Sequence, residues 1–292
     1  MKDLKGIYSA LLVSFDSNGK INEKGLRQII RHNIDNMRID GLYVGGSSGE
    51  NFLLSTEEKK QILKITKDEA KESIKLIAQV GSLNLHESCE LGVLATDLGY
   101  DALSAVTPFY YKFNFAEIKN YYERIIKASQ NYMIIYSIPF LTGTNINIEQ
   151  FKSLYENEKI IGVKFTAADF FLLERLKKTF PKHLIFAGFD EMLLSASTLG
   201  IDGAIGSTFN INAKRAKRIW ELAKSGKITE ALKLQNETND IIECILQNGL
   251  YQSLKELLKL QGIEAGFCRE PMTKDLTNEQ KNIIKELKNK YL

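Results

Sequence analysis

One lysine stands in a segment whose other residues suit a buried strand. Lys164 lies in the run 160–168, which carries no other charge and is rich in residues typical of buried parallel strands. Burial strips water from an ammonium group, so we expect the pKa of Lys164 to fall until some of it is neutral amine at about pH 7. A neutral amine can attack a carbonyl carbon and form a Schiff base. The alternative is a lysine that ends the strand in solvent.

Strand alternation predicts the neighbours of this amine. The face of Lys164 is expected to hold Ile160, Gly162 and Thr166, and the opposite face Ile161, Val163 and Phe165. Tyr136 lies on the preceding predicted strand, so its phenol could exchange a proton with a substrate bound at Lys164 if consecutive strands are neighbours. The alternative is a core tyrosine with a satisfied hydroxyl.

Two polar turns could bind other parts of a substrate. Residues 45–49, Gly-Gly-Ser-Ser-Gly, would place backbone N–H groups and two hydroxyls around a small concavity suited to a carboxylate, although such turns are often only turns. Asp190 and Glu191 follow a later strand, where they could accept hydrogen bonds from a polyol. Capping of a helix start explains the same acids equally well.

The elements that must position these residues alternate along the chain. β-like runs are predicted at 7–13, 41–46, 75–81, 102–108, 133–139, 160–167, 184–189 and 203–207, with helical stretches between them. Helix starts are indicated at Asn22, at Ser55 with Glu58 and at Asn147 with Gln150. Eight strand–helix units in this length of chain predict an α/β fold, a (β/α)8 TIM barrel in residues 1–225, rather than a doubly wound sheet. Residues 226–292 are predicted to form C-terminal helices at 228–247, 250–260 and 278–291, packed on the barrel as one structural unit.

Composition narrows the class of protein. The 292 residues are 44% hydrophobic and 26% charged, with 39 Lys+Arg against 36 Asp+Glu and no basic stripe, so neither nucleic acid nor a membrane is an expected partner. Three dispersed cysteines and the lack of a signal-like or membrane-spanning segment predict a cytoplasmic protein. No histidine pair has metal-ligand spacing, so no metal is expected. His32 and His86 are predicted to be on the surface.

Six motifs in order resemble one enzyme family over essentially the whole chain. They are YVGGSSGEN (43–51), TPFYY (107–111), YSIP (136–139), GVKFTA (162–167), GFDE (188–191) and DGAIGSTFN (202–210). The chain is similar to the pyruvate-dependent class I aldolases, which include dihydrodipicolinate synthase and N-acetylneuraminate lyase. The resemblance implies a barrel with C-terminal helices, assembled as a homotetramer.

The resemblance also implies roles for individual residues. Lys164 would be the Schiff-base nucleophile and Tyr136 the proton-transfer residue. Ser47 and Ser48 would hold the pyruvate carboxylate, and Tyr110 would reach the neighbouring subunit's site and complete a hydroxyl relay with Ser47 and Tyr136. The positions that would contact the sugar portion are Thr166, Gly188, Asp190, Glu191 and Ser207.

One local difference separates two activities of the family. Dihydrodipicolinate synthases carry an arginine where this chain has Leu141, and leucine cannot make the bidentate contact to a carboxylate that arginine makes. Together with the polar rim from Thr166 to Ser207, this difference favours the lyase over the synthase. The resemblance then implies reversible, cofactor-free cleavage of N-acetylneuraminate (sialic acid) to pyruvate and N-acetylmannosamine. Phe109, Leu141 and Tyr251 are expected to shape the far end of the pocket. The alternatives are a lyase for another 2-keto-3-deoxy sugar acid, dihydrodipicolinate synthase, and a non-catalytic barrel that senses sialic acid or pyruvate.

Overall fold

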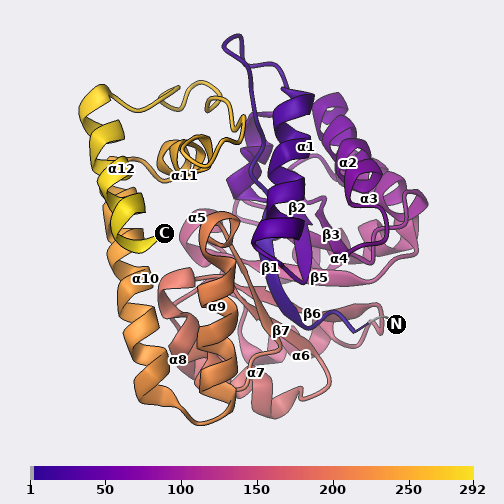
Figure 1. Cartoon of the computed structure of the whole chain (residues 1–292). Helices are drawn as coiled ribbons and strands as arrows, with labels where there is room; N and C mark the ends of the chain where they lie inside the picture. Colours follow the sequence, from indigo (N-terminus) through magenta and orange to yellow (C-terminus); the bar gives the residue numbers. More distant parts are fainter. Residues whose placement is uncertain (1–2) are drawn as a thin grey trace.

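The computed structural model describes residues 3–292 and contains a closed, parallel eight-stranded barrel with strand order β1 to β8 (Figure 1). The TIM barrel predicted from the sequence is therefore confirmed. The strands are β1 (Gly6–Ala10), β2 (Gly41–Val44), β3 (Lys75–Gln79), β4 (Ala102–Val106), β5 (Met133–Ser137), β6 (Ile160–Phe165), β7 (Leu184–Ala187) and β8 (Gly203–Gly206). Each begins within one residue of its predicted start and ends one to three residues earlier, so the polar motifs follow the strands as loops.

Helices surround the barrel between successive strands. They are α1 (Glu23–Arg31), α2 (Thr56–Ala70), α3 (Leu85–Asp97), α4 (Phe115–Ser129), α5 (Pro139–Thr142), α6 (Ile148–Leu154), α7 (Phe170–Thr179), α8 (Leu193–Thr198) and α9 (Phe209–Lys224). The predicted caps are confirmed, since Asn22 caps α1 and capping boxes begin α2 at Ser55 and α6 at Asn147.

Three further helices follow the barrel: α10 (Ile228–Asn248), α11 (Leu250–Lys259) and α12 (Asn278–Tyr291). Helices α10 and α12 lie side by side along one flank of the molecule, and α10 packs on α8 and α9 (Figure 1). Helix α11 contacts α9, α10 and α12. The division into residues 1–225 and 226–292 stays a prediction, because these contacts join the helices to the barrel.

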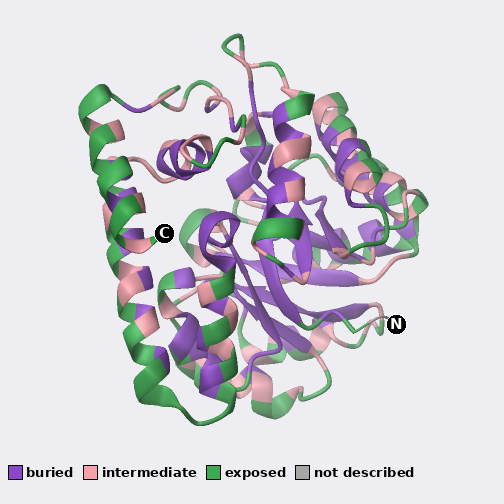
Figure 2. Cartoon of the chain, in the orientation of Figure 1, coloured by how far each residue is buried: buried purple, intermediate pink, exposed green. Residues whose placement is uncertain are grey.

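Two apolar clusters make up the core, and the strands are buried at every residue except Lys75 of β3 (Figure 2). One cluster lies between the strands and the helices. The other fills the barrel with inward-facing side chains, among them Tyr8, Tyr43, Tyr136, Ile161 and Phe186. This filled interior confines any site to the mouth of the barrel, as is usual for the fold.

Two local predictions are wrong. Met133 pairs with Ile160 but Ile134 pairs with Gly162, so the register shifts around Ile161. Because of this irregularity Ile161 belongs to the barrel interior and Ile160 to the outer cluster, the reverse of strict alternation.

His32 is the second correction, because it is buried rather than on the surface. It follows the last residue of α1 in a π-helical turn, and its Nε2 lies 3.0 Å from the carbonyl oxygen of Asn210. Asn210 is 178 positions away in the sequence, so the residues around His32 in the sequence did not indicate that it is buried. His86, by contrast, is exposed as predicted.

Candidate active site

Lys164 ends inside the mouth of the barrel, in contact with two aromatic rings. Its Nζ lies 4.0 Å from the ring centroid of Tyr136 and 4.1 Å from that of Tyr43. Only 4% of the residue is exposed. Burial lowers the pKa of Lys164 to about 7, although the charge of Asp190 opposes that fall. At neutral pH the side chain is therefore partly a free amine, as the sequence predicts.

Tyr136 is the residue paired with Lys164 across the β5–β6 ladder. Burial raises the pKa of its phenol, while the hydroxyls of Ser47 and Thr166 act in the opposite direction. The Thr166 hydroxyl has no hydrogen-bond partner of good geometry and is buried. An unsatisfied hydroxyl beside the amine and the phenol is a group ready to bind a polar ligand atom.

Asp190 is a buried carboxylate held by the loop after β8. One of its oxygens accepts hydrogen bonds from the Thr208 backbone N–H at 2.8 Å and from the Thr208 hydroxyl at 2.6 Å. Burial raises the pKa of Asp190 to about 6, with a further rise from Glu191, while Thr208 and Lys164 act against it. Near neutral pH Asp190 therefore still carries charge, and it is the carboxylate that influences the Lys164 amine.

The serines of residues 45–49 lie at the same mouth. They form a short 3-10 turn, Ser47–Gly49, and the hydroxyl of Ser48 lies 2.6 Å from that of Ser207 after β8. Ser48 is buried and Ser47 is partly exposed. The turn thus joins the ends of β2 and β8 and presents hydroxyl groups on the same side of the barrel as Lys164.

Two hollows flank this centre. The larger, of about 900 Å³, is lined by Thr166, Phe165 and Phe189 and by residues of α5–α7. The smaller, of about 240 Å³, is lined by Ser47 and by apolar side chains that include Phe109, Leu141 and Tyr251, the three predicted to shape the pocket. Lys164 lines neither hollow, and its side chain is buried.

Two predicted residues are not part of this compact group. Tyr110 is 83% exposed and its ring contacts that of Tyr111, at a centroid distance of 5.1 Å. Glu191 is the middle residue of the short turn Asp190–Met192 and is exposed at the rim of the barrel. The other predicted residues come together: Lys164, Tyr136, Ser47, Ser48, Thr166, Gly188, Asp190 and Ser207.

Tyr43 is the residue that sequence reasoning missed. Its ring contacts the Lys164 amine, its hydroxyl donates to the Ser104 hydroxyl at 3.0 Å, and burial raises its pKa well above the usual value. It also packs edge-on against Tyr136 at 6.0 Å. Its position on β2, two residues before the glycines of residues 45–49, is the signal that could have found it.

Metal-binding clusters and membrane-spanning helices are absent from residues 3–292. No group of three potential metal-binding side chains occurs there, and the three cysteines are free. No helix in this range is long and apolar enough to cross a membrane.

The chain belongs to the dihydrodipicolinate synthetase family, whose model matches residues 3–290. The family and the barrel fold that the motifs implied are therefore confirmed.

Within that family, several relatives more than 60% identical to this chain are named N-acetylneuraminate lyase. A protein of Pasteurella multocida named N-acetylneuraminate lyase is 69% identical over 292 residues, covering all of both chains. A crystal structure of CdNal from Clostridium difficile in complex with mannosamine has a TM-score of 0.98 and 67% identity over all of both chains. N-acetylneuraminate lyase from Fusobacterium nucleatum complexed with pyruvate has a TM-score of 0.95 and 65% identity, covering 99% of this chain and 97% of the other.

Proposed function

We propose that this protein is a Schiff-base aldolase that reversibly cleaves N-acetylneuraminate to pyruvate and N-acetylmannosamine. The single observation that carries the proposal is the buried Lys164 amine, with a pKa of about 7, in contact with the ring of Tyr136. The names of the most similar relatives support the choice of substrate.

The reaction begins at the amine. The carboxylate of the open-chain keto acid binds at the hydroxyls of Ser47 and Ser48, which places the C2 carbonyl before Lys164. Neutral Lys164 attacks C2, and loss of water leaves an iminium. Only the unprotonated amine can attack, so the low pKa of Lys164 raises the reactive fraction at neutral pH.

Carbon–carbon cleavage follows. A base removes the proton of the C4 hydroxyl, the C3–C4 bond breaks, and its electron pair moves to the iminium to give a neutral enamine. Tyr136 is the group proposed for this proton transfer. Burial raises the pKa of its phenol, so the bound substrate carboxylate must help to take the proton. Protonation of the enamine at C3 and hydrolysis then release pyruvate.

The sugar part is assigned to the polar rim after β6, β7 and β8. Thr166, Asp190 and Ser207 offer hydroxyl and carboxylate groups there, with Gly188 and Glu191 beside them. Such groups suit a neutral polyhydroxylated chain. Leu141, 58% exposed on the apolar side of the smaller hollow, offers no positive charge to a second carboxylate.

Borohydride reduction tests the proposal directly. With pyruvate present, reduction should add the pyruvate skeleton to a peptide that contains Lys164, and Lys164→Met should lose the adduct. Release of pyruvate from N-acetylneuraminate should be lost in the same variant. A wild-type protein that is not labelled, or one that is labelled equally after the substitution, contradicts the assignment.

We further propose a homotetramer in which Tyr110 serves a neighbouring subunit's site. The supporting observation is exposure: Tyr110 is 83%, Tyr111 67% and Phe140 85% exposed, which is unusual for such large apolar side chains in an isolated subunit. Sedimentation should give the mass of four chains, and Tyr110→Phe should lower turnover without removing the borohydride adduct. A stable, active monomer would contradict both statements.

We also propose a cytoplasmic location, which the three free cysteines support. Cell fractionation with an antibody to the protein tests it, and recovery in an extracellular fraction would contradict it.

A further inference from the structure

A buried ion pair lies directly behind the serine turn at residues 45–49. Lys255 Nζ and Glu50 Oε1 are 2.6 Å apart, and their side chains are 1% and 0% exposed. Glu50 follows the turn in sequence, whereas Lys255 lies on α11, 205 residues away. The pair therefore joins the turn to the C-terminal helices.

Glu50 is fixed more firmly than an ion pair alone requires. Its second carboxylate oxygen accepts the backbone N–H of Arg269 at 2.6 Å, so both oxygens are used. Lys255 also donates to the carbonyl of Phe267 at 2.6 Å, and its Nζ lies 4.8 Å from the ring centroid of Phe15. A buried pair survives desolvation only when the remaining donors and acceptors are satisfied in this way.

The backbone of Glu50 is in a conformation that glutamate rarely adopts. Its φ is 57° and ψ 31°, the left-handed region that is unfavourable for a residue with a side chain. Its N–H donates to the carbonyl of Ser47 at 2.9 Å and so closes the turn. The side-chain contacts with Lys255 and Arg269 therefore hold a backbone geometry on which the position of Ser47 depends.

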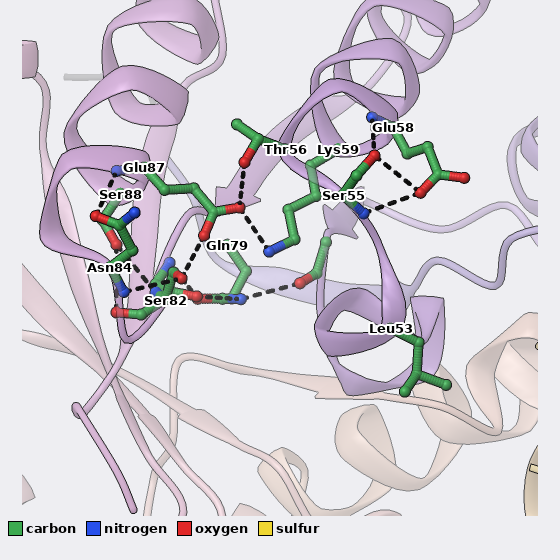
Figure 3. Close-up of polar contacts among 12 residues, drawn as sticks. Leu53, Ser55, Thr56, Glu58, Lys59, Gln79, Ser82, Asn84, Glu87 and Ser88 are labelled. Atoms are coloured by element: carbon green, nitrogen blue, oxygen red, sulfur yellow. Dashed lines mark hydrogen bonds and ion pairs between the residues drawn. The ribbon is translucent and has the colours of Figure 1, made fainter. Parts of the chain in front are cut away.

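The other end of the turn is held in a different way. Gln79, at the end of β3, donates from Nε2 to the carbonyl of Gly45 at 3.0 Å, and its Oε1 accepts from Val106 N–H at 3.2 Å. Figure 3 shows Gln79 among the polar side chains that link α2 to α3, where Lys59 and Glu87 point toward one another. A Cβ at Gly45 (φ +80°) would lie 2.7 Å from the Gln79 carbonyl oxygen, so the approach is close. Side-chain contacts thus hold both ends of the turn, Gln79 at Gly45 and Lys255 at Glu50.

We propose that Lys255 and Glu50 are positioning residues that fix the Ser47–Ser48 turn for the substrate carboxylate. This inference rests on the proposed function, because it concerns the affinity of that turn for a 2-oxo acid. The pair does not touch substrate and acts only through the backbone of the turn. Neither charge is among the influences on the pKa of Lys164, which are burial and the Asp190 carboxylate.

The test is the pyruvate dependence of adduct formation in the Lys255→Met variant. Without the Lys255–Glu50 ion pair the turn is less rigid, so the pyruvate concentration for half-maximal borohydride trapping should rise at least about tenfold. The trapping rate at saturating pyruvate should change by less than about threefold. Lys217→Met is the matched control, because Lys217 pairs with Asp40 at 2.7 Å just before β2, at the opposite end of the strand from the turn. This control should bind pyruvate as the wild type does.

A second pair of variants separates positioning from general damage. In a Ser48→Ala background, Lys255→Met should change the pyruvate requirement by less than about twofold, since the two act through the same turn. If Lys255→Met does not fold, the double variant Glu50→Gln/Lys255→Met, which removes both charges, is measured by the same criterion.

A pyruvate requirement unchanged from wild type, or an effect that simply multiplies with that of Ser48→Ala, overturns the inference. Absence of any adduct in the wild-type protein refutes the proposed function instead.

Discussion

Lys164 and Tyr136 occupy paired positions on β6 and β5, and the amine lies 4.0 Å from the centre of the phenol ring. Two opposing effects act on the amine there. The aromatic faces of Tyr136 and Tyr43 favour the ammonium form, whereas burial favours the neutral form. Burial is the larger effect, because the pKa of Lys164 falls to about 7. The fold therefore keeps a group at the mouth of the barrel in a state that costs stability.

Lys164→Met should stabilise the folded protein. With an ordinary pKa of 10.5 in the unfolded chain and about 7 in the folded one, the folded state binds fewer protons between these values. The lysine thus destabilises the fold most below about pH 7, and the penalty disappears as pH rises toward 10.5. At pH 7 the variant should gain on the order of 1–4 kcal/mol in free energy of unfolding.

Denaturant titration at pH 6.5 and pH 9.5 measures this difference. The gain should shrink at the higher pH, and the exposed Lys112→Met should show no comparable gain at either pH. A Lys164→Met protein less stable than wild type at pH 6.5 would show that burial of the Lys164 amine does not lower the free energy of unfolding.

Asp190→Asn should shift the pH profile of adduct formation, so that the trapping rate begins to rise at a lower pH. The Asp190 carboxylate raises the pKa of Lys164 by its charge, so an uncharged amide lets that pKa fall further. We expect the midpoint of the borohydride trapping rate with pyruvate to shift down by up to about one pH unit. Pyruvate is used alone because it lacks the sugar portion that Asp190 is proposed to bind. An upward shift would mean that the coupling between the two groups has the opposite sign.

Tyr136→Phe should separate Schiff-base formation from bond cleavage. The ring that covers the amine is retained, so pyruvate should still be trapped on Lys164. Loss of the phenol removes the proton-transfer group, and turnover of N-acetylneuraminate should fall by about 10²–10⁴-fold. Equal losses in trapping and turnover would instead indicate that the phenol is needed to form the adduct. Tyr132→Phe, at the residue immediately before β5, is the control.

The fold and most of the site could be predicted from the sequence because both depend on local patterns. Alternating strands and helices predicted the barrel, and the rule that function gathers at carboxyl strand ends placed Lys164, Ser48 and Asp190 together. Adjacency of consecutive strands then brought Tyr136 to Lys164.

What the sequence did not reveal depends on contacts between distant segments or on small irregularities. The exchange of Ile160 and Ile161 follows from one register shift that leaves no mark in composition. His32 is buried by Asn210, and Glu50 is held by Lys255, each from a segment more than 170 positions away. Tyr43 was missed because an aromatic residue on a strand reads as ordinary core.

Gly188→Ala should damage the sugar end of the site and spare the pyruvate end. A Cβ at Gly188 would lie 1.9 Å from the Thr166 hydroxyl oxygen, so Thr166 would have to move. Thr166 is proposed to bind the sugar, and its displacement should lower kcat/KM for N-acetylneuraminate by about 10–100-fold. Trapping of pyruvate on Lys164 should stay close to wild type, since that step needs only the amine and the serine turn.

Gly92→Ala is the matched control for this substitution. It lies within α3, and its nearest Cβ contacts of 3.3 Å, to Leu103 and Ser129, require only a small adjustment. Steady-state kinetics with N-acetylneuraminate and trapping with pyruvate are compared for both variants. If Gly188→Ala cleaves the sugar acid normally, Thr166 does not contact the sugar. If it loses pyruvate trapping as well, the crowding reaches Lys164 through β6, and the two ends of the site are not separable at this position.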